Sequence, residues 1–503
     1  MAFKPNDPPP PPTPGKGPAP IQAGSRPAAA PARNDVAPKL AAKPQPASVS
    51  GLRSEPASKR LISLDAYRGF IMTLLAANGF GILALSKTPA DSALWKLLDR
   101  EIWRRIGFHF DHPAWRSNFL FGPSTDALDG SPWMRGAVSL WDLIQPAFMF
   151  MVGTAMAYSA RKRDALGEPR WKQWMHVFIR AIVLVLLGVF LSSMGTQQTH
   201  WEFPNVLAQI GLGYVFVFAV VRWKWWGQVA AIAAILIGTW AAFFMHVPPE
   251  NYNFAAVGAT AEKGEVLGPP FRQWSKNGNF AHDVDVKFLN KLPRLEDQEG
   301  QPIPFEFNRG GYQTLNFLPS IATMILGVIC GQILQRPASP WKRVGLLLGL
   351  ALLCFGLGIA LGVWGCPIVK RIWTPSWVLF SGGYVIALLA LFFALFDALP
   401  LGVVAFPLVV VGTNSLLIYL MGQTLRSWTS AKIIHTHFHK LIERGLGGIA
   451  DATGLTARLP DTGRSSGAVI YDLFGPVVDS TAVFLVFWLV LYALYRKQIF
   501  MRI

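Results

Sequence analysis

Ten apolar stretches, each about as long as a bilayer is thick, constrain this chain more than any other feature of its sequence. A helix needs roughly 20 apolar residues to cross about 30 Å of hydrocarbon. The stretches lie at residues 61–85, 138–160, 176–195, 205–222, 227–247, 314–335, 343–364, 375–396, 403–422 and 474–495. The sequence therefore predicts an all-α polytopic membrane protein with about ten transmembrane helices.

The composition agrees with this class. The chain is 52% hydrophobic and 15% charged, whereas soluble domains carry about 25% charged residues. A formal net charge of +17 would suit a nucleic-acid-binding protein, but the basic residues stand in short clusters between the apolar stretches. Such clusters are typical of loops at the inner leaflet, so we expect a lipid bilayer and no nucleic acid as partner.

The two ends of the chain differ in kind. Residues 1–59 are rich in proline and alanine and predict a disordered tail, because they have too little apolar area to offset chain entropy. Residues 60–503 predict one transmembrane domain. Basic clusters such as Arg161 to Arg163 follow the second, fourth, sixth and last apolar stretches, and the opposite short loops carry few charges. Both termini are therefore expected in the cytoplasm.

This orientation places three long segments on the far side of the membrane, which is the periplasm if the chain lies in a bacterial inner membrane. The segments are residues 86–137, 248–313 and 423–467. At about 65 residues, the segment 248–313 is longer than a passive connection needs, so we expect it to form an ordered cap. Residues 431–446 have apolar positions at helical spacing and predict an interfacial helix or a short re-entrant piece.

Two histidines and an acid stand at the entrance of the second apolar stretch. His109 and His112 flank Asp111, and Asp142 begins the stretch that follows. Histidine is the side chain best matched to proton transfer near neutral pH. A carboxylate beside it could fix the imidazole tautomer. The alternatives are solvated loop histidines and an Asp142 that merely caps its helix with Ser139.

The first apolar stretch carries polar residues at both ends. Asp65 and Arg68 are three residues apart on one helix face, which suits either an intrahelical ion pair or an Arg68 that binds an anionic cytosolic ligand such as a phosphate. At the other end Asn78 could position a reacting group or cap the helix.

Other polar residues give weaker indications. His200 lies in a short loop on the same side as His112 and could line a site or simply be solvated. His435, His439 and Glu443 share a helix face, but a solvated amphipathic face explains them better than a metal site, and no metal is expected. The chain has no P-loop, nucleophile elbow or Rossmann fingerprint, which argues against ATP coupling and serine-hydrolase chemistry.

Several motifs together resemble one family. They are RLISLDAYRGF, HPAW followed by SLWDLIQPAFMFMVGTAMAYS, FPNVLAQIGLGYVF, GYQTLNFLPSIATMILGVICGQIL, PLVVVGTNSLLIYL and LYRKQIFMRI. In this order they resemble the heparan-alpha-glucosaminide N-acetyltransferase family, and more narrowly its bacterial relatives, over residues 60–503. The resemblance implies a transmembrane acyltransferase domain that moves an acetyl group from cytosolic acetyl-CoA to an amino sugar or glycan on the far side.

The resemblance also implies roles for individual residues. His112 matches the essential histidine of an HxxW pattern, Asn78 a family asparagine, and Asp142 the acid of a D-L-x-x-P motif. Arg68 with Asp65 is then the expected contact for acetyl-CoA at the cytosolic end. The histidine would either accept the acetyl group or act as general base, and both routes remain open.

The acceptor is less well defined. His109, Trp115 and His200 are the candidates for its side of the site. Residues 86–111 are inserted relative to the lysosomal branch, and Arg116 and Ser117 follow Trp115 where family members often carry Asn and Gly. These departures put the identity of the acceptor in doubt.

Two other functions are compatible with the sequence. A transporter or flippase for a small glycan or lipid precursor would suit spans that look broken, at Pro146 and Gly153 for example. A non-catalytic scaffold would use the proline-rich tail. The sequence permits a homodimer but does not predict one.

Overall fold

The computed structural model describes residues 61–112, 114–117 and 138–501. Residues Met1–Lys59 and Arg60–Ile503 form two separate units, and the described helices all belong to the second. The tail predicted to be disordered and cytoplasmic, residues 1–59, therefore lies outside the described residues, as do residues 118–137 of the first long segment.

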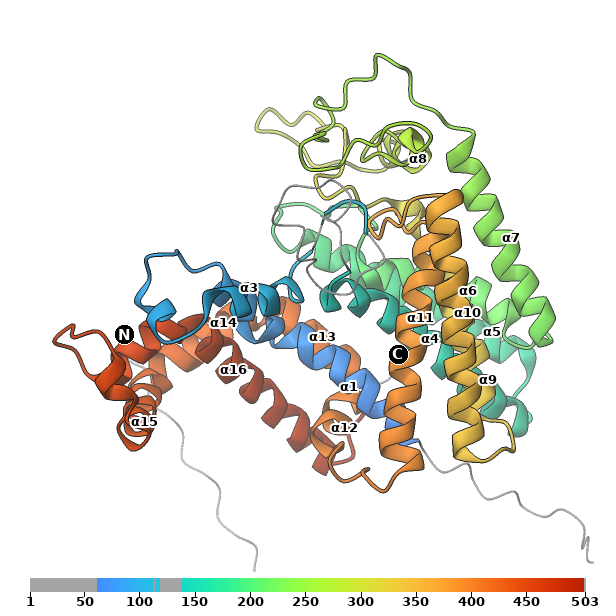
Figure 1. The fold of residues 1–503 in the computed structure, drawn as a ribbon. Helices are drawn as coiled ribbons and strands as arrows, with labels where there is room; N and C mark the ends of the chain where they lie inside the picture. The colour runs from blue at the N-terminus through green and yellow to red at the C-terminus, as the bar shows by residue number, and fades with distance from the viewer. Residues whose placement is uncertain (1–60, 113, 118–137, 502–503) are drawn as a thin grey trace, which may run out of the picture. The chain divides into compact units, whose positions relative to one another are not determined.

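Seven helices of the described part are long and apolar enough to cross a membrane (Figure 1). They are α4 (Leu140–Ala165), α5 (Arg170–Ser193), α7 (Trp225–Phe244), α9 (Phe317–Leu334), α10 (Pro340–Trp364), α11 (Pro375–Phe393) and α16 (Ser466–Arg496). A further apolar helix, α6 (Val206–Val220), has 15 residues. It is about 22 Å long and thus shorter than the hydrocarbon core of a bilayer.

Two more spans are bent. Helix α1 (Ile62–Ala76) meets η1 (Asn78–Gly81) and α2 (Ile82–Ser86) at 49°, and α12 (Phe406–Thr413) meets α13 (Ser415–Thr424) at 80°. If each bent pair is one span, the described residues contain up to nine. Each of the ten apolar stretches coincides with a helix, so the predicted all-α polytopic fold is confirmed, with seven to nine spans in place of about ten.

Shorter elements connect the spans. They are η2 (Ala93–Lys96), α3 (Arg100–Phe108), η4 (Arg272–Trp274), α8 (Phe280–Leu289), η5 (Thr314–Asn316), η6 (Ala394–Ala398), α14 (Arg426–Trp428), η7 (Thr429–Phe438), α15 (His439–Ala452) and η8 (Leu455–Arg458). The amphipathic piece expected at residues 431–446 is divided, because a π-helical η7 precedes α15.

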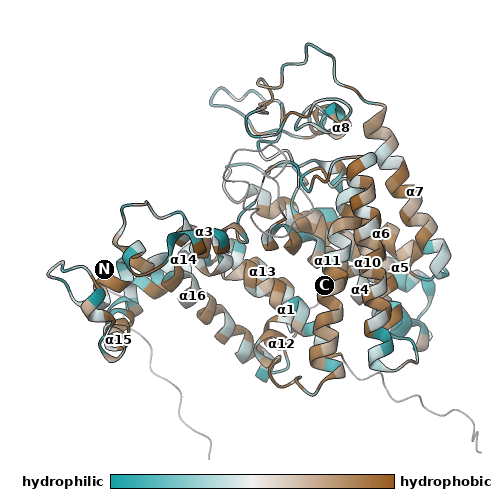
Figure 2. Ribbon diagram, in the orientation of Figure 1, coloured by the Kyte–Doolittle hydropathy of each residue, from teal (hydrophilic) through white to brown (hydrophobic). Residues whose placement is uncertain are grey.

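The spans fall into inner and outer helices. In the inner helices α4 and α9, 72% and 78% of the most apolar segment is buried inside the protein. In the outer helices α5, α7 and α10, the buried share is 28%. Large apolar side chains such as Ile237 on α7 and Leu352 on α10 are exposed, and Figure 2 shows hydrophobic residues over both helices. Exposed apolar faces on long helices are expected where lipid is the solvent.

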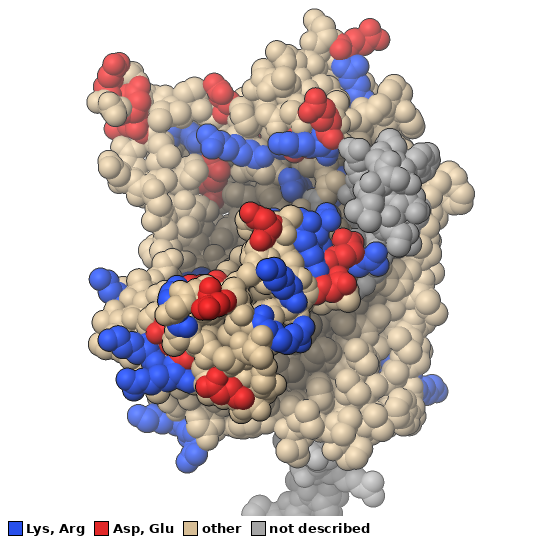
Figure 3. Space-filling view, turned by 60° about the vertical axis from the view of Figure 1, so that its left-hand side comes forward, with Lys and Arg blue, Asp and Glu red and all other residues tan. Residues whose placement is uncertain are grey.

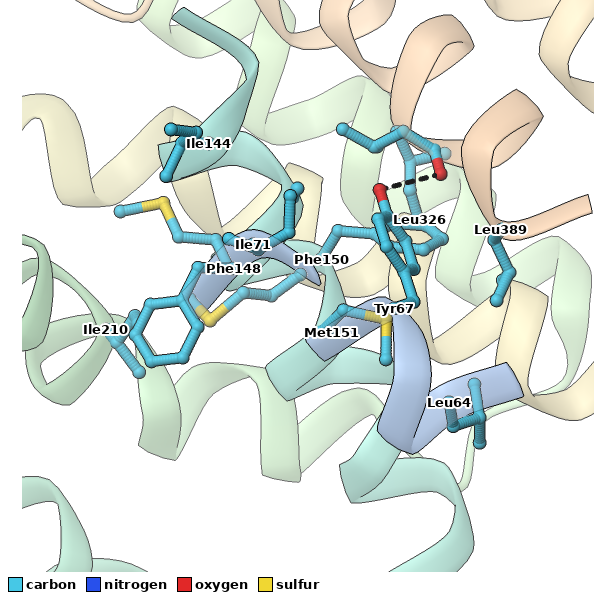
Figure 4. Close-up of a cluster of buried hydrophobic side chains, with 14 of the residues drawn as sticks. Leu64, Tyr67, Ile71, Ile144, Phe148, Phe150, Met151, Ile210, Leu326 and Leu389 are labelled. Atoms are coloured by element: carbon cyan, nitrogen blue, oxygen red, sulfur yellow. Dashed lines mark hydrogen bonds between the residues drawn. The ribbon is translucent and has the colours of Figure 1, made fainter. Parts of the chain in front are cut away.

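The core lies where inner helices cross (Figure 4). Tyr67 of α1 is fully buried there, and its hydroxyl donates a hydrogen bond of 3.2 Å to the Val385 carbonyl of α11. Leu326 of α9 and Phe150 of α4 pack in the same cluster. This one buried polar side chain is thus satisfied by a backbone acceptor, as a low-dielectric environment requires.

Glycines let α4 and α9 approach closely. A Cβ atom at Gly153 would lie 1.8 Å from the Met324 carbonyl oxygen, and one at Gly327 would lie 2.0 Å from that of Phe150. Small residues at such crossings allow backbone contact between membrane helices. Gly153 therefore packs a continuous helix and does not mark the break that the sequence suggested.

Residues 248–313 form an ordered segment, here called the cap, which contains η4 and α8 at the top of Figure 1. Trp274 is buried in it with 1% of its surface exposed. Lys276 and Glu265 form a buried ion pair of 2.7 Å. Glu265 also accepts a hydrogen bond from the Thr260 amide, and Lys276 donates one to the Gly258 carbonyl. Removing only one partner of such a buried ion pair is costly, so the pair stabilises the cap.

Buried amides join the cap to the spans. The Gln209 side chain of α6 donates to the carbonyl oxygens of Phe203 at 2.7 Å and Thr314 at 3.2 Å. The Gln313 side chain donates to Asn277 Oδ1 in the cap at 3.1 Å. The start of α9 is thus held by both α6 and the cap.

Asp285 of α8 is the buried acid of this region. It is 2% exposed, and its Oδ2 accepts a hydrogen bond of 2.9 Å from the Thr314 backbone amide. Burial raises the pKa of the Asp285 carboxyl to about 6, although the hydrogen bond from Thr314 acts in the opposite direction. Since an unfolded aspartate titrates near 3.9, the protonated acid stabilises the fold below about pH 4. That contribution is lost as the pH rises through about 6.

Asp285→Asn should therefore stabilise the protein above pH 6 and not below pH 4. The amide keeps an acceptor for Thr314 and carries no buried charge. We expect the thermal unfolding midpoint to rise by about 3 °C at pH 8, with no difference from the parent at pH 4. Glu299→Gln, at an exposed position, serves as control. An equal shift at both pH values would show that the carboxyl of Asp285 is not the titrating group.

Candidate active site

The segment carrying His112 is fixed by backbone contacts at both ends. The His109 carbonyl accepts a hydrogen bond of 2.9 Å from the Trp141 amide at the start of α4. On the other side, the Ser117 amide donates to the Ile368 carbonyl at 2.7 Å in the connection between α10 and α11. His112 is thus held between α4 and residues 366–373.

His112 faces Asp142 across this junction. The His112 Nδ1 atom lies 3.1 Å from Asp142 Oδ1, and 42% of the histidine side chain is exposed against 5% of the aspartate. Ser139 accepts a hydrogen bond from the Asp142 amide at 3.1 Å and so caps α4. Because Ser139 supplies the cap, the Asp142 carboxylate is available to the histidine.

A third residue, Lys370, completes the cluster. Its Nζ lies 2.9 Å from Asp142 Oδ1 and 3.3 Å from His112 Nδ1, and only 6% of its side chain is exposed. The sequence analysis did not identify Lys370 as a site residue, because it treated this position only as a loop charge. Its position in the short connection between two apolar stretches was the available indication of a functional lysine. No sequence pattern, however, pairs it with an acid 228 positions away.

The charges in the cluster are defined by these contacts. Burial lowers the pKa of the His112 imidazole, the nearby Lys370 lowers it further, and the hydrogen bond with Asp142 opposes them only in part. Burial also disfavours a charged Lys370, but attraction to Asp142 prevails and raises the pKa of its ammonium group. At neutral pH the cluster therefore holds a neutral histidine beside an ammonium–carboxylate pair.

Two partners face the same nitrogen of His112. Nδ1 lies 3.1 Å from Asp142 Oδ1 and 3.3 Å from Lys370 Nζ, so it either donates to the carboxylate or accepts from the ammonium group. Lys370 also donates to the same carboxylate at 2.9 Å. In the tautomer that donates from Nδ1, the lone pair of His112 lies on Nε2. Such a histidine can remove a proton or attack an acyl carbon.

Asn78 lies in a left-handed turn that interrupts the first span. Asn78, Gly79, Phe80 and Gly81 have φ values of 49°, 58°, 53° and 69° in succession. A Cβ atom at Gly79 would lie 2.5 Å from the Phe110 ring, so the turn packs against the segment that carries His112. The Asn78 side chain itself is exposed. Glycine adopts a positive φ without steric cost and asparagine tolerates it, so the strain of this turn falls mainly on Phe80 and is about 1–2 kcal/mol.

The expected donor contact lies further along α1. Arg68 Nη1 and Asp65 Oδ1 are 3.6 Å apart, with 23% and 8% of their side chains exposed. Eight residues separate Arg68 from Ala76 at the end of α1, which is about 12 Å along a helix. Helix α1 and the turn that follows it thus link Arg68 to the His112 segment.

The three acceptor-side candidates have different surroundings. The ring of His109 packs edge-on against Phe108, and burial lowers its pKa. Trp115 is 2% exposed, and its indole donates a hydrogen bond of 3.0 Å to the Trp274 carbonyl, so it anchors the cap. His200 lies 2.9 Å from Glu202. The structure brings together His112 and Asp142, while Trp115 and His200 have hydrogen-bond or ion-pair partners of their own.

The described part of the chain contains no group of three metal-ligating side chains that could hold an ion. The two histidines of the helix face at His435, His439 and Glu443 each lie beside a carboxylate. His435 Nε2 lies 3.1 Å from Asp479 Oδ2, and His439 Nε2 lies 3.3 Å from Glu443 Oε1.

One family model matches part of the chain. The model describes the catalytic region of heparan-alpha-glucosaminide N-acetyltransferase, and it matches residues 124–263. This segment includes Asp142 and His200, whereas His112 and Lys370 lie outside it. No curated protein matches the chain. The match confirms the resemblance seen in the sequence and indicates a membrane enzyme of the acetyltransferase type. It gives no support to a transporter or flippase.

Lys370→Met should raise the pKa of His112. The substitution removes a positive charge 3.3 Å from Nδ1 that disfavours the imidazolium, and it leaves the carboxylate of Asp142 to attract it. Histidine NMR of the intact protein would follow this titration, with Lys291→Met in the exposed part of the cap as control. A His112 pKa that is unchanged or lower in Lys370→Met would contradict the assigned charges.

Proposed function

We propose that the chain transfers an acetyl group from cytosolic acetyl-CoA to the amine of an extracytoplasmic amino sugar or glycan. The observation that carries the proposal is His112, whose Nδ1 contacts Asp142 and Lys370 while 42% of its side chain is exposed. The matched catalytic region supports the reaction class.

Two routes use this histidine. In direct transfer, Nε2 removes a proton from the amine as the amine attacks the thioester carbonyl; the C–S bond breaks and the CoA sulfur takes the proton from His112. In the covalent route, Nε2 attacks the thioester carbonyl, the C–S bond breaks, and CoA leaves as the thiolate while an acetyl-imidazolium forms. The amine then attacks the acetyl carbon, the bond to Nε2 breaks, and the amine proton passes to the CoA thiolate. Both routes need the Nδ1–H tautomer that Asp142 favours. Asn78 is the proposed group that orients the acyl oxygen.

The donor is proposed to approach along α1. Arg68 offers a planar fork of donors to a CoA phosphate, and Asp65 holds that fork in place. The pantetheine arm would then extend along the helix toward the turn at Asn78. We propose this orientation because the basic clusters favour cytoplasmic termini, and the proposed location is a bacterial inner membrane.

The proposed acceptor side carries a hollow. The proposed acceptor side includes the cap and the segment with α3, and Figure 3 shows a hollow below the cap with Lys and Arg side chains along its upper edge. A polar acceptor could approach there from solution or along the bilayer. The acceptor's identity and a homodimer remain outside the proposal.

His112→Ala should abolish acetyl transfer and leave acetyl-CoA binding intact. We expect turnover of purified protein with acetyl-CoA and glucosamine to fall by about 10²–10⁴-fold, since the acid–base or acyl-accepting group is removed. Calorimetric titration with CoA checks binding, and His437→Ala on the exposed face of η7 is the matched control. Turnover close to that of the parent protein would refute the role of His112.

Arg68→Ala should weaken binding of acetyl-CoA more than binding of the acceptor. Loss of one charge-assisted contact to a phosphate corresponds to about a tenfold higher Kd. Titrations with acetyl-CoA and with dephospho-CoA would measure it, alongside Lys342→Ala at the exposed start of α10. Unchanged CoA affinity in Arg68→Ala would place the phosphates elsewhere.

A further inference from the structure

Two arginines lie between the candidate active site and the cap. Arg371 directly follows Lys370, and its Nη1 donates a hydrogen bond of 3.3 Å to the Gly310 carbonyl in the cap. The Arg116 guanidinium lies over the ring of Phe271, also in the cap, with 5.6 Å between Cζ and the ring centroid. Each arginine therefore extends from the segments of the candidate site to the underside of the cap.

Both arginines belong to the junction that holds His112. The positive charge of Arg371 is near enough to His112 to lower the pKa of the imidazole. Arg116 follows His112 by four positions, and the Ser117 amide next to it donates to the Ile368 carbonyl at 2.7 Å, three positions before Arg371. The two guanidinium groups thus come from the two backbone segments that meet at the candidate site.

Both arginines are without a carboxylate partner among the described residues, whereas Lys370 is paired with Asp142. Arg371 is only partly exposed, and burial lowers the pKa of the Arg116 guanidinium, so both charges have lost part of their hydration. Three cationic side chains therefore share one carboxylate at this junction. Partly buried charge of one sign is unfavourable unless an opposite charge compensates it, and an anionic ligand would do so.

The two guanidinium groups have surface that a ligand can contact. Arg116 is exposed. Arg371 donates through Nη1 to the cap, while its Nε and Nη2 have no hydrogen-bond partner in the described part of the chain and are not fully buried. Lys and Arg side chains also gather along the cap edge of the hollow in Figure 3. A planar fork of open N–H donors matches the oxygens of a phosphate or a carboxylate.

The charge on such a ligand belongs to the acceptor and not to the donor. The proposed contact for the CoA phosphates is Arg68, and about 12 Å of helix α1 separate it from Ala76, before the turn that packs against the His112 segment. The end of acetyl-CoA that would reach His112 is a thioester, which carries no charge. An anion held at the junction of Arg371 and Arg116 therefore comes from the molecule that receives the acetyl group.

We infer that Arg371 and Arg116 form an anion subsite for the acceptor, which is then an amino sugar that carries a phosphate or a carboxylate. The inference rests on the proposed acetyl transfer, because that reaction defines the acceptor. Arg371 holds the anion beside Lys370 while His112 acts on the amine, and Arg116 contacts the anion from the other segment. The arginines thus select the acceptor and take no part in moving its proton.

The test compares three acceptors with the full-length protein and acetyl-CoA: glucosamine, glucosamine 6-phosphate and glucosaminuronic acid. The parent protein should use one of the two anionic sugars with a kcat/KM at least tenfold above that for glucosamine, and which one it prefers distinguishes phosphate from carboxylate. This preference should fall about tenfold in Arg371→Gln and in Arg116→Gln. Arg371→Lys, which keeps the charge without the fork, should lie between. Arg444→Gln, at an exposed position of α15, is the control.

Binding provides a measurement that does not require turnover. In calorimetric titrations, the preferred anionic sugar should bind about tenfold more weakly to Arg371→Gln and to Arg116→Gln than to the parent protein. Arg116 is exposed, so its substitution tests the subsite even where Arg371→Gln fails to fold.

Two results would overturn the subsite. One is an unchanged preference in both variants, or a parent protein that prefers glucosamine. The other is an equal fall in kcat with all three acceptors, which would assign Arg371 to the reacting acyl oxygen. Arginine-dependent binding of an anionic sugar without any acetyl transfer would instead refute the proposed function and leave the anion subsite standing. Transfer to glucosamine without such binding would do the reverse.

Discussion

The ion pair between Asp142 and Lys370 is the interaction on which the candidate site depends. A carboxylate buried at the end of a membrane span is costly unless a charge and hydrogen bonds compensate it, and Lys370 Nζ at 2.9 Å supplies both. Removing either residue alone would leave an uncompensated buried charge. The pair therefore fixes the connection between α10 and α11 against the start of α4, and His112 takes its orientation from the carboxylate between them.

Strain and packing bring the first span to this pair. Helix α1 ends at Ala76, and the glycines of the turn that follows pack closely against two neighbours. A Cβ atom would lie 2.5 Å from the Phe110 ring at Gly79, and 2.0 Å from the Pro476 carbonyl oxygen of α16 at Gly81. The turn at Asn78 thus lies between two neighbours that determine its left-handed conformation. A helix that carries Arg68 at one end consequently reaches the His112 segment at the other.

The sequence was sufficient to predict the spans and two of the three residues in the cluster, since apolar length identifies membrane helices and a histidine before an acid suggests acid–base chemistry. It could not predict Lys370, because an ion pair across 228 positions depends on how helices pack. It also misplaced the breaks. Pro146 lies within a continuous α4, where it removes only the donor for the Asp142 carbonyl, while the real breaks fall at Asn78 and Asn414.

Asn414 shows why such breaks are hard to read from sequence. Its side chain does not cap α13; it donates to the Ile499 carbonyl at 3.1 Å and accepts from the Met501 amide at 2.9 Å. The Asn414 side chain at the break between α12 and α13 thus has its hydrogen-bond partners near residue 500, so these residues are part of the helix bundle. Both bent spans pack together, with Gly412 against the backbone of Asp65. The proposed donor site at Asp65 and Arg68 therefore lies where the two interrupted spans pack against each other. The bends of both spans depend on partners that are distant in sequence.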